Sequence, residues 1–190
     1  MQSFNFFLKR SQKKNFLLLF STDSKLLKKN MSKYRNDSLL WLLNYMVNFN
    51  SIPPAGDYLN YGKSLLICCK GDGNIAAAER AFVIGYFAAF GRPDDVLDTL
   101  ATYDGTGDLK AILSSSSQLQ MNSKAAIWDA VRASNVDGDL AVGEVEVIKN
   151  IAKMLNISAS EVDDIISIYH AEEAIKATRL QITYPNGSPY

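Results

Sequence analysis

Apolar side chains recur three and four positions apart along most of the chain after residue 38, which is the spacing of one face of an α-helix. These runs predict helices over 39–49, 58–69, 76–90, 93–102, 109–113, 123–133, 141–155 and 159–177. Alternation of apolar and polar residues, which is typical of a half-buried strand, occurs only in the tail at 180–184. The pattern therefore predicts an all-α fold, built as a compact helical bundle.

Residues that favour helix ends separate these runs. Gly91 suits a C-terminal cap, and Pro93 suits the first turn of the helix that follows. Ser158, with Glu161 three positions on, has the form of a capping box and opens the last helix. Loop composition is found in 103–108, 114–117 and 136–139. The chain is therefore divided into helices with short connections.

The first predicted helix, 39–49, is apolar nearly all round. Its apolar residues are Leu39, Leu40, Trp41, Leu42, Leu43, Tyr45, Met46 and Val47. A helix of this kind needs neighbours on every side, so we expect it to be buried. We expect both tryptophans, Trp41 and Trp128, to serve in core packing.

Two segments of the chain resemble each other at an offset of 65 residues. The first runs Asp-Gly-Asn-Ile from Asp72 and reaches Glu79, and the second runs Asp-Gly-Asp-Leu from Asp137 and reaches Glu144. Apolar residues of the following helices align in the pairs Phe82 and Val147, Val83 and Ile148, Tyr86 and Ile151, and Phe90 and Leu155. A repeated helical unit buries its apolar face against its partner, which predicts two pseudo-symmetric repeats in the bundle.

Each aligned position has a structural role that follows from its residue type. The glycine can take a positive φ in the turn, and the apolar residue after it can plug the core. The residue between them can cap the next helix, and the glutamate lies in the first turn, where the helix dipole favours negative charge. The pairs are Gly73 and Gly138, Ile75 and Leu140, Asn74 and Asp139, and Glu79 and Glu144.

The doubled pattern Asp-Gly-x-[Ile/Leu]-x-x-x-Glu, followed by an apolar helix, resembles the TerB-like domains, a family named for tellurite-resistance proteins. The resemblance covers about residues 37–178 and is clearest in 134–166, which contains NVDGDLAVGEVEVIKNIAKMLNIS. It is weaker in the first segment, where Asn74 replaces the second acid. The resemblance implies an all-helical fold and an acidic cluster that binds divalent cations. By this resemblance, the residues of the acidic cluster are Asp72, Glu79, Asp137, Asp139 and Glu144.

These five acids are the candidate metal site of the sequence. Hard cations such as Ca²⁺ and Mg²⁺ need several oxygen ligands, which the carboxylates supply if the two turns meet; Mn²⁺ and Zn²⁺ are further candidates. An EF-hand is excluded, because counting from Asp137 places Val142 at the sixth position, where that loop needs glycine. The alternative is that the acids only cap helices and face solvent.

Other reactive residues do not form a recognisable site. Cys68 and Cys69 are adjacent and have no matching pair elsewhere, which argues against a zinc site or a disulfide and predicts buried, reduced thiols. His170 is the only histidine, and we expect it to be structural or on the surface. Asp104 and Asp108 lie in a Gly-rich loop typical of a solvated connection. We therefore expect no enzymatic activity and no catalytic residue.

Charge is unevenly spread over the 190 residues, although its sum is zero. Residues 1–35 carry nine Lys or Arg and one acid, and residues 36–190 carry an excess of eight acids. An acidic body argues against nucleic acid as a partner. The basic segment has the composition of an organelle transit peptide, or is an arm or extension before Met31. No apolar run has the ~20 residues of a membrane-spanning helix.

These features predict a basic N-terminal extension over 1–35, a TerB-like helical domain over 36–178 and a tail over 179–190. The leading hypothesis is a non-enzymatic module that binds a divalent cation weakly and acts through a protein partner. A structural subunit of a larger, organellar assembly is the first alternative, and a metal-assisted hydrolase is the second. We expect an intracellular protein, in the cytoplasm or, with a transit peptide, in a mitochondrion or plastid. The sequence leaves the partner and the oligomeric state open.

Overall fold

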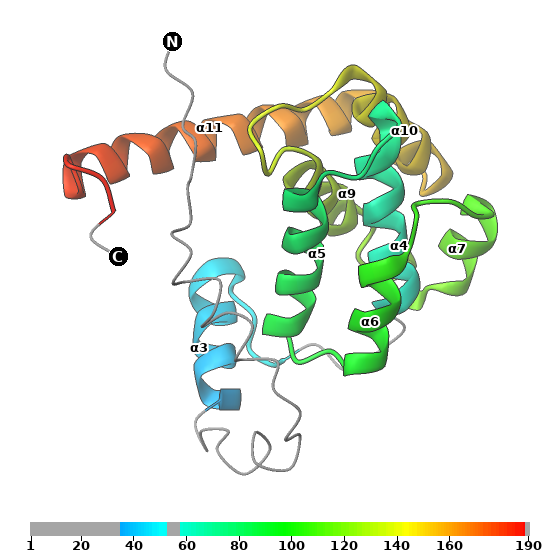
Figure 1. The fold of residues 1–190 in the computed structure, drawn as a ribbon, viewed down its shortest axis with the longest axis horizontal. Helices are drawn as coiled ribbons and strands as arrows, with labels where there is room; N and C mark the ends of the chain where they lie inside the picture. Colours follow the sequence, from blue (N-terminus) through cyan, green and yellow to red (C-terminus); the bar gives the residue numbers. More distant parts are fainter. Residues whose placement is uncertain (1–34, 53–57, 189–190) are drawn as a thin grey trace. The chain divides into compact units, whose positions relative to one another are not determined.

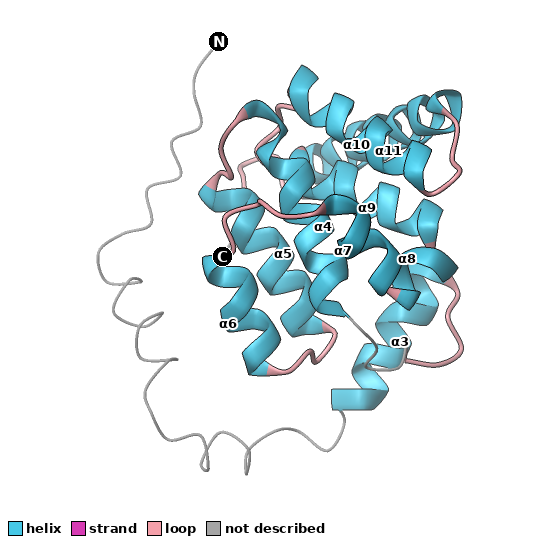
Figure 2. Cartoon of the chain, turned by 90° about the vertical axis from the view of Figure 1, so that its right-hand side faces the viewer, coloured by secondary structure: helices cyan, strands magenta, loops and turns pink. Residues whose placement is uncertain are grey.

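The computed structural model describes residues 35–52 and 58–188. The chain divides into two units, Met1–Ile52 and Pro53–Tyr190. The described part of the first unit holds one helix, α3 (Arg35–Val47). The second unit holds α4 (Tyr58–Cys69), the 3₁₀ turn η1 (Lys70–Asp72), α5 (Ala77–Ala89), α6 (Asp94–Thr102), α7 (Leu109–Ser115), α8 (Ser117–Met121), α9 (Ser123–Ser134), α10 (Val142–Met154) and α11 (Ala159–Thr183) (Figure 1). No strand occurs among the described residues (Figure 2), and the all-α prediction is confirmed.

Helix α4 lies at the centre of the second unit, where it contacts α5, α6, α7, α8, α9 and α10. Its apolar run 65–69 is buried except for the half-buried Ile67. Gly62 allows the neighbouring helices to come close, because a Cβ there would lie 2.6 Å from Leu100 Cδ1 and 2.7 Å from Phe87 Cε2. The absence of a side chain at Gly62 therefore sets how closely α4 packs against α5 and α6.

One apolar core joins the helices of the second unit. Its fully buried side chains include Leu65, Leu66, Val83, Phe87, Leu100, Leu119, Ile127, Val131, Ile148 and Val162. Ile148, Ile151 and Ala152 of α10 and Val162 and Tyr169 of α11 all belong to this core. Helix α11 packs against α9 and α10, and Ile165 and Ile166 add half-buried contacts to the same core.

A buried polar group links α4 and α9 within this core. Asp129, which is 6% exposed, accepts a hydrogen bond from the Tyr61 hydroxyl at 2.9 Å and one from Arg132 at 3.2 Å. The Tyr86 hydroxyl also bonds to this carboxylate. A buried charge needs such partners, because taking an ion out of water without them costs several kcal/mol. The cluster therefore fixes how α4, α5 and α9 pack together.

The prediction that the first helix is buried was wrong. Most apolar side chains of α3 are exposed, including Trp41 at 67%, Tyr45 at 78% and Met46 at 60%. The rings of Trp41 and Tyr45 stack on each other at 5.7 Å. The described part of this unit contains one helix, so it offers no second helix of its own to cover an all-round apolar surface. Trp128, in contrast, packs against the core of the second unit, as predicted.

Three local predictions also need correction. Pro93 is the N-cap residue before α6 rather than part of its first turn. The Ser-rich loop at 114–117 gives way to the short helix α8, because the buried Ser116 caps it by accepting a hydrogen bond from Leu119 N. The tail 180–184 is not a strand, since α11 continues to Thr183. Gly91, with a φ of 71°, ends α5 as predicted. None of the described helices is long and apolar enough to cross a membrane.

Candidate functional site

The two acidic turns have the same local construction. Gly73 and Gly138 have φ values of 105° and 94°, so both occupy the left-handed region that favours glycine. The Asp72 carboxylate accepts a hydrogen bond from Asn74 N at 2.9 Å. The Asp137 carboxylate accepts the corresponding bond from Asp139 N at 3.2 Å. Each aspartate therefore closes its own turn, and both side chains are exposed.

The helices that follow the turns also begin alike. Their N-cap residues are Ala76 and Ala141, with φ, ψ of −63°, 153° and −64°, 149°. An alanine has no side-chain acceptor, so the capping role predicted for Asn74 and Asp139 was wrong. The glutamates close the helix ends instead: Glu79 Oε2 accepts from Ala76 N, and Glu144 Oε2 accepts from Ala141 N at 2.7 Å.

The two turns meet at a backbone contact that only glycine permits. A Cβ on Gly71 would lie 2.4 Å from Glu144 Cα, and a Cβ on Gly143 would lie 2.2 Å from the carbonyl oxygen of Gly71. Real Cβ atoms do not approach backbone this closely. Neither glycine was predicted as a contact residue from the sequence. Gly143 was a signal, because glycine is unfavourable in the first turn of a helix. This contact brings the start of α10 against η1.

Glu79 and Glu144 come together beneath that contact. Their side chains are 4% and 2% exposed, and their carboxyl groups hydrogen-bond to each other. Burial, with the hydrogen bond that Glu79 donates to Glu144 as the second cause, raises the pKa of Glu79 to about 8. Burial also raises the pKa of Glu144, whose carboxyl bonds to Ser134 as well. A hydrogen bond between two carboxyl groups requires one proton, so the pair holds a single negative charge near neutral pH.

The aspartates flank this pair in a crossed arrangement. The negative charge of Asp137 acts on Glu79, and that of Asp72 acts on Glu144, and each raises the pKa of the glutamate from the other segment. The arrangement follows from the contact of the two turns, which places each turn beside the helix start of the other segment. The structure therefore brings four of the five predicted acids into one neighbourhood.

Asp139, the fifth acid, has an exposed side chain, and its backbone N–H is used by Asp137. Across residues 35–52 and 58–188, no three acidic, His or Cys side chains stand together in a geometry that holds a metal ion. The side-chain oxygen of Asn135, at the start of the second turn, is buried without a hydrogen-bond partner among these residues.

The remaining reactive residues lie elsewhere. Cys68 and Cys69 are free and fully buried, as predicted, and burial raises the pKa of the Cys69 thiol to about 12. His170 is exposed on α11. Asp104 accepts hydrogen bonds from Thr106, and Asp108 caps α7, so both acids of that loop have structural roles.

Comparison with solved structures gives a match over most of the chain. A tellurite resistance protein from Nostoc punctiforme is 33% identical, with a TM-score of 0.74. The alignment covers 84% of this chain and 100% of that one. The chain belongs to the TerB-like tellurite resistance family. This confirms the resemblance to the family and the all-helical fold that it implies. No family model matches this TerB-like chain. No curated protein matches it either.

Proposed function

We propose that this TerB-like protein is a non-catalytic binding module. In this proposal it takes up a divalent cation weakly where its two acidic turns meet, and it acts through other proteins. The observation that carries the cation part is the crossed placement of Asp72, Glu79, Asp137 and Glu144 around one backbone contact. Similarity to a tellurite resistance protein supports a role in the response to tellurite.

The chemistry of the donor set fits a hard cation. Ca²⁺ and Mg²⁺ prefer carboxylate and carbonyl oxygens, and all the donor atoms of the four acids are oxygens. We propose Asp72, Glu79, Asp137 and Glu144 as ligands, with Asp139 as the fifth acid of the set. The bound cation would supply positive charge that offsets the clustered carboxylates.

Weak rather than tight binding follows from the present arrangement. Glu79 and Glu144 already satisfy each other through a shared proton, and each also closes its own helix end. A cation must compete with these bonds, so we expect dissociation constants on the order of 0.1–1 mM, as in low-affinity Ca²⁺ modules. Buried, mutually bonded carboxyls also support a binding role over hydrolysis, because metal catalysis needs an open coordination position.

The protein-binding part of the proposal is supported by α3. Trp41, Tyr45 and Met46 are each at least 60% exposed on this one helix. Aromatic and methionine side chains are enriched in protein interfaces, where they contribute much of the binding energy.

Calorimetric titration of the full chain with Ca²⁺, Mg²⁺, Mn²⁺ and Zn²⁺ tests the cation site. The informative variant is Asp72→Asn with Asp137→Asn, because asparagine keeps the oxygen that closes each turn and removes only the charge. The matched control is Asp104→Asn with Asp108→Asn, in the acidic loop away from the paired turns. We expect saturable heat for wild type and control, and its loss in the paired-turn variant.

Two other results would count against this assignment. No saturable heat in the wild type would remove the cation part and leave the structural-subunit function as the better description. Equal loss of the saturable heat in the control variant would place the cation in the 104–108 loop instead.

A further inference from the structure

Helix α11 is packed over only its first half. Its buried residues are Val162 and Tyr169, and it contacts α9 and α10. After Tyr169, the residues up to Thr183 are exposed apart from half-buried Glu173, and this half continues beyond α9 and α10 (Figure 1). A helical segment of about four turns has marginal stability in water without packing. The free half of α11 is therefore a candidate for contact with another helix.

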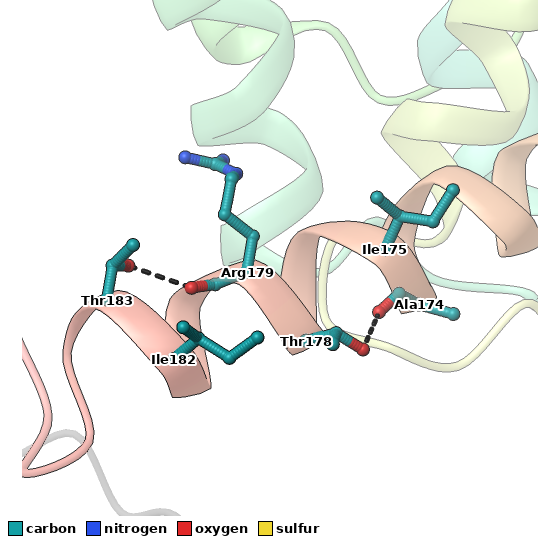
Figure 3. A pocket seen from close by; sticks show the side chains of 6 residues that line it. All are labelled: Ala174, Ile175, Thr178, Arg179, Ile182 and Thr183. Atoms are coloured by element: carbon teal, nitrogen blue, oxygen red, sulfur yellow. Dashed lines mark hydrogen bonds between the residues drawn. The ribbon is translucent and has the colours of Figure 1, made fainter.

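One face of this half carries a regular stripe of apolar and small residues. Ala171, Ile175, Thr178 and Ile182 follow each other at spacings of four, three and four, and the two isoleucines are 69% and 75% exposed. Figure 3 shows that the Thr178 hydroxyl turns back to its own helix, where it donates to the Ala174 carbonyl at 2.9 Å. Its polar atom is thus already satisfied. The spacing is that of residues facing a partner in a two-stranded coiled coil.

We propose that the stripe is the contact surface of a homodimer, in which residues 170–183 of two copies pair as antiparallel helices. The pairing sets Ile175 against the partner's Thr178 and Ile182 against the partner's Ala171. Each of the four layers then joins one large and one small side chain, which lets the helices approach closely. The overlap spans the half of α11 that its own chain leaves exposed.

The charged residues beside the stripe determine both which partner fits and whether the two helices pair antiparallel. Glu172 and Arg179 lie seven residues apart, on the same flank of the stripe, and both are exposed. In the antiparallel register, Glu172 of each copy lies beside the partner's Arg179, which gives two symmetric ion pairs. The opposite flank carries the uncharged residues Ala174 and Gln181. A second copy of this chain therefore supplies the complement that the flank needs.

A parallel pairing lacks this complement. Parallel helices would bring Glu172 towards the partner's Ser167 and Arg179 towards the partner's Ala174, neither of which is charged. The antiparallel arrangement is thus the one that both the layers and the charges favour. The interface is small, so we expect a dissociation constant on the order of 10–100 µM.

Sedimentation equilibrium of the full chain over 5–500 µM tests the proposal. We expect dimerisation of the wild type and a dissociation constant raised more than tenfold by Ile175→Glu. The matched control is Leu180→Glu, the same kind of change on the same helix but outside the stripe, where the side chain is 41% exposed. We expect dimerisation to survive it. Circular dichroism of each variant checks that α11 remains folded.

Charge reversal tests the register. Glu172→Arg alone and Arg179→Glu alone each place like charges together, so each is expected to weaken the dimer about three- to tenfold. The combination of both restores opposite charges and is expected to recover wild-type affinity. A wild type that stays monomeric to 500 µM would overturn the proposal. An Ile175→Glu variant that dimerises as tightly as the wild type would overturn it too. So would a double reversal that leaves the dimer as weak as the single reversals do.

Discussion

The carboxyl groups of Glu79 and Glu144, 65 positions apart in sequence, hydrogen-bond to each other in the buried contact between the two acidic turns. Each glutamate also accepts a hydrogen bond from the backbone N–H of the N-cap residue of its own helix. The pair therefore ties two helix starts together across the core. Its dependence on one proton makes the stability of this contact sensitive to pH.

Raising the pH from 5 to 8 should lower the free energy of unfolding. The pKa of Glu79 is raised from its ordinary 4.5 to about 8 in the folded protein. Between these values the folded state keeps a proton that the unfolded chain has lost, so the stabilisation is full below about pH 4.5 and is lost as the pH rises towards 8. Urea unfolding at a series of pH values, with a chelator present, measures this slope.

Glu79→Gln should flatten that slope, because the amide donates to the Glu144 carboxylate at every pH. The control is Glu161→Gln. The pKa of Glu161 is lowered to about 2 by its hydrogen bonds with Lys124 and Ser158, so this group stays ionised in both states over the same range. A steep slope that survives in Glu79→Gln would show that the pair does not hold the proton.

Gly143→Ala should destabilise the protein by about 2–4 kcal/mol, since the new Cβ would meet the Gly71 carbonyl oxygen and neither backbone can move freely. Gly85→Ala is the matched control. Gly85 also lies within a helix, α5, but a Cβ there meets nothing within 4 Å. That change should stabilise the protein by about 0.5–1 kcal/mol through helix propensity. Equal effects of the two changes in denaturant unfolding would contradict the close contact of the turns.

Tyr61→Phe should cost about 1–3 kcal/mol of stability, because it removes a hydrogen bond from the buried Asp129 carboxylate. Tyr103→Phe removes a tyrosine hydrogen bond to Thr106 in an exposed loop, so its cost should be under about 1 kcal/mol. Thermal or urea unfolding of both variants gives the comparison. A harmless Tyr61→Phe would mean that other groups or water satisfy Asp129.

Cys68 and Cys69 should resist thiol reagents in the native protein at pH 8. Both are fully buried, and burial raises the pKa of each thiol, so almost no reactive thiolate is present. The rate at which the thiols react with Ellman's reagent, followed by absorbance, should equal the rate of unfolding and should rise sharply in denaturant. Fast release from the folded protein would show that α4 opens locally.

Sequence periodicity located most helices well, because burial of one face imposes its spacing on the residues. Helix α4 begins and ends where predicted, and α5, α9 and α10 agree within about two residues. The wrong predictions concern segments whose structure depends on their surroundings as well as on their local composition. The apolar surface of α3 suggested burial, yet its unit has no second described helix to provide it. Residues 180–184 alternate as a strand does, yet α11 propagates through them, since adding a residue to a formed helix is favourable.

The sequence by itself determined the helical class, the turn glycines and the acids on which the candidate site depends. These features follow from spacing and from the conformational freedom of single residues. Only the tertiary structure decided which acids meet. Asp72, Asp137 and Asp139 remain at the surface, whereas Glu79 and Glu144 are buried against each other because Gly71 and Gly143 let two backbones touch. Such a contact joins residues far apart in the chain, and its energy depends on distances between helices that no local pattern specifies.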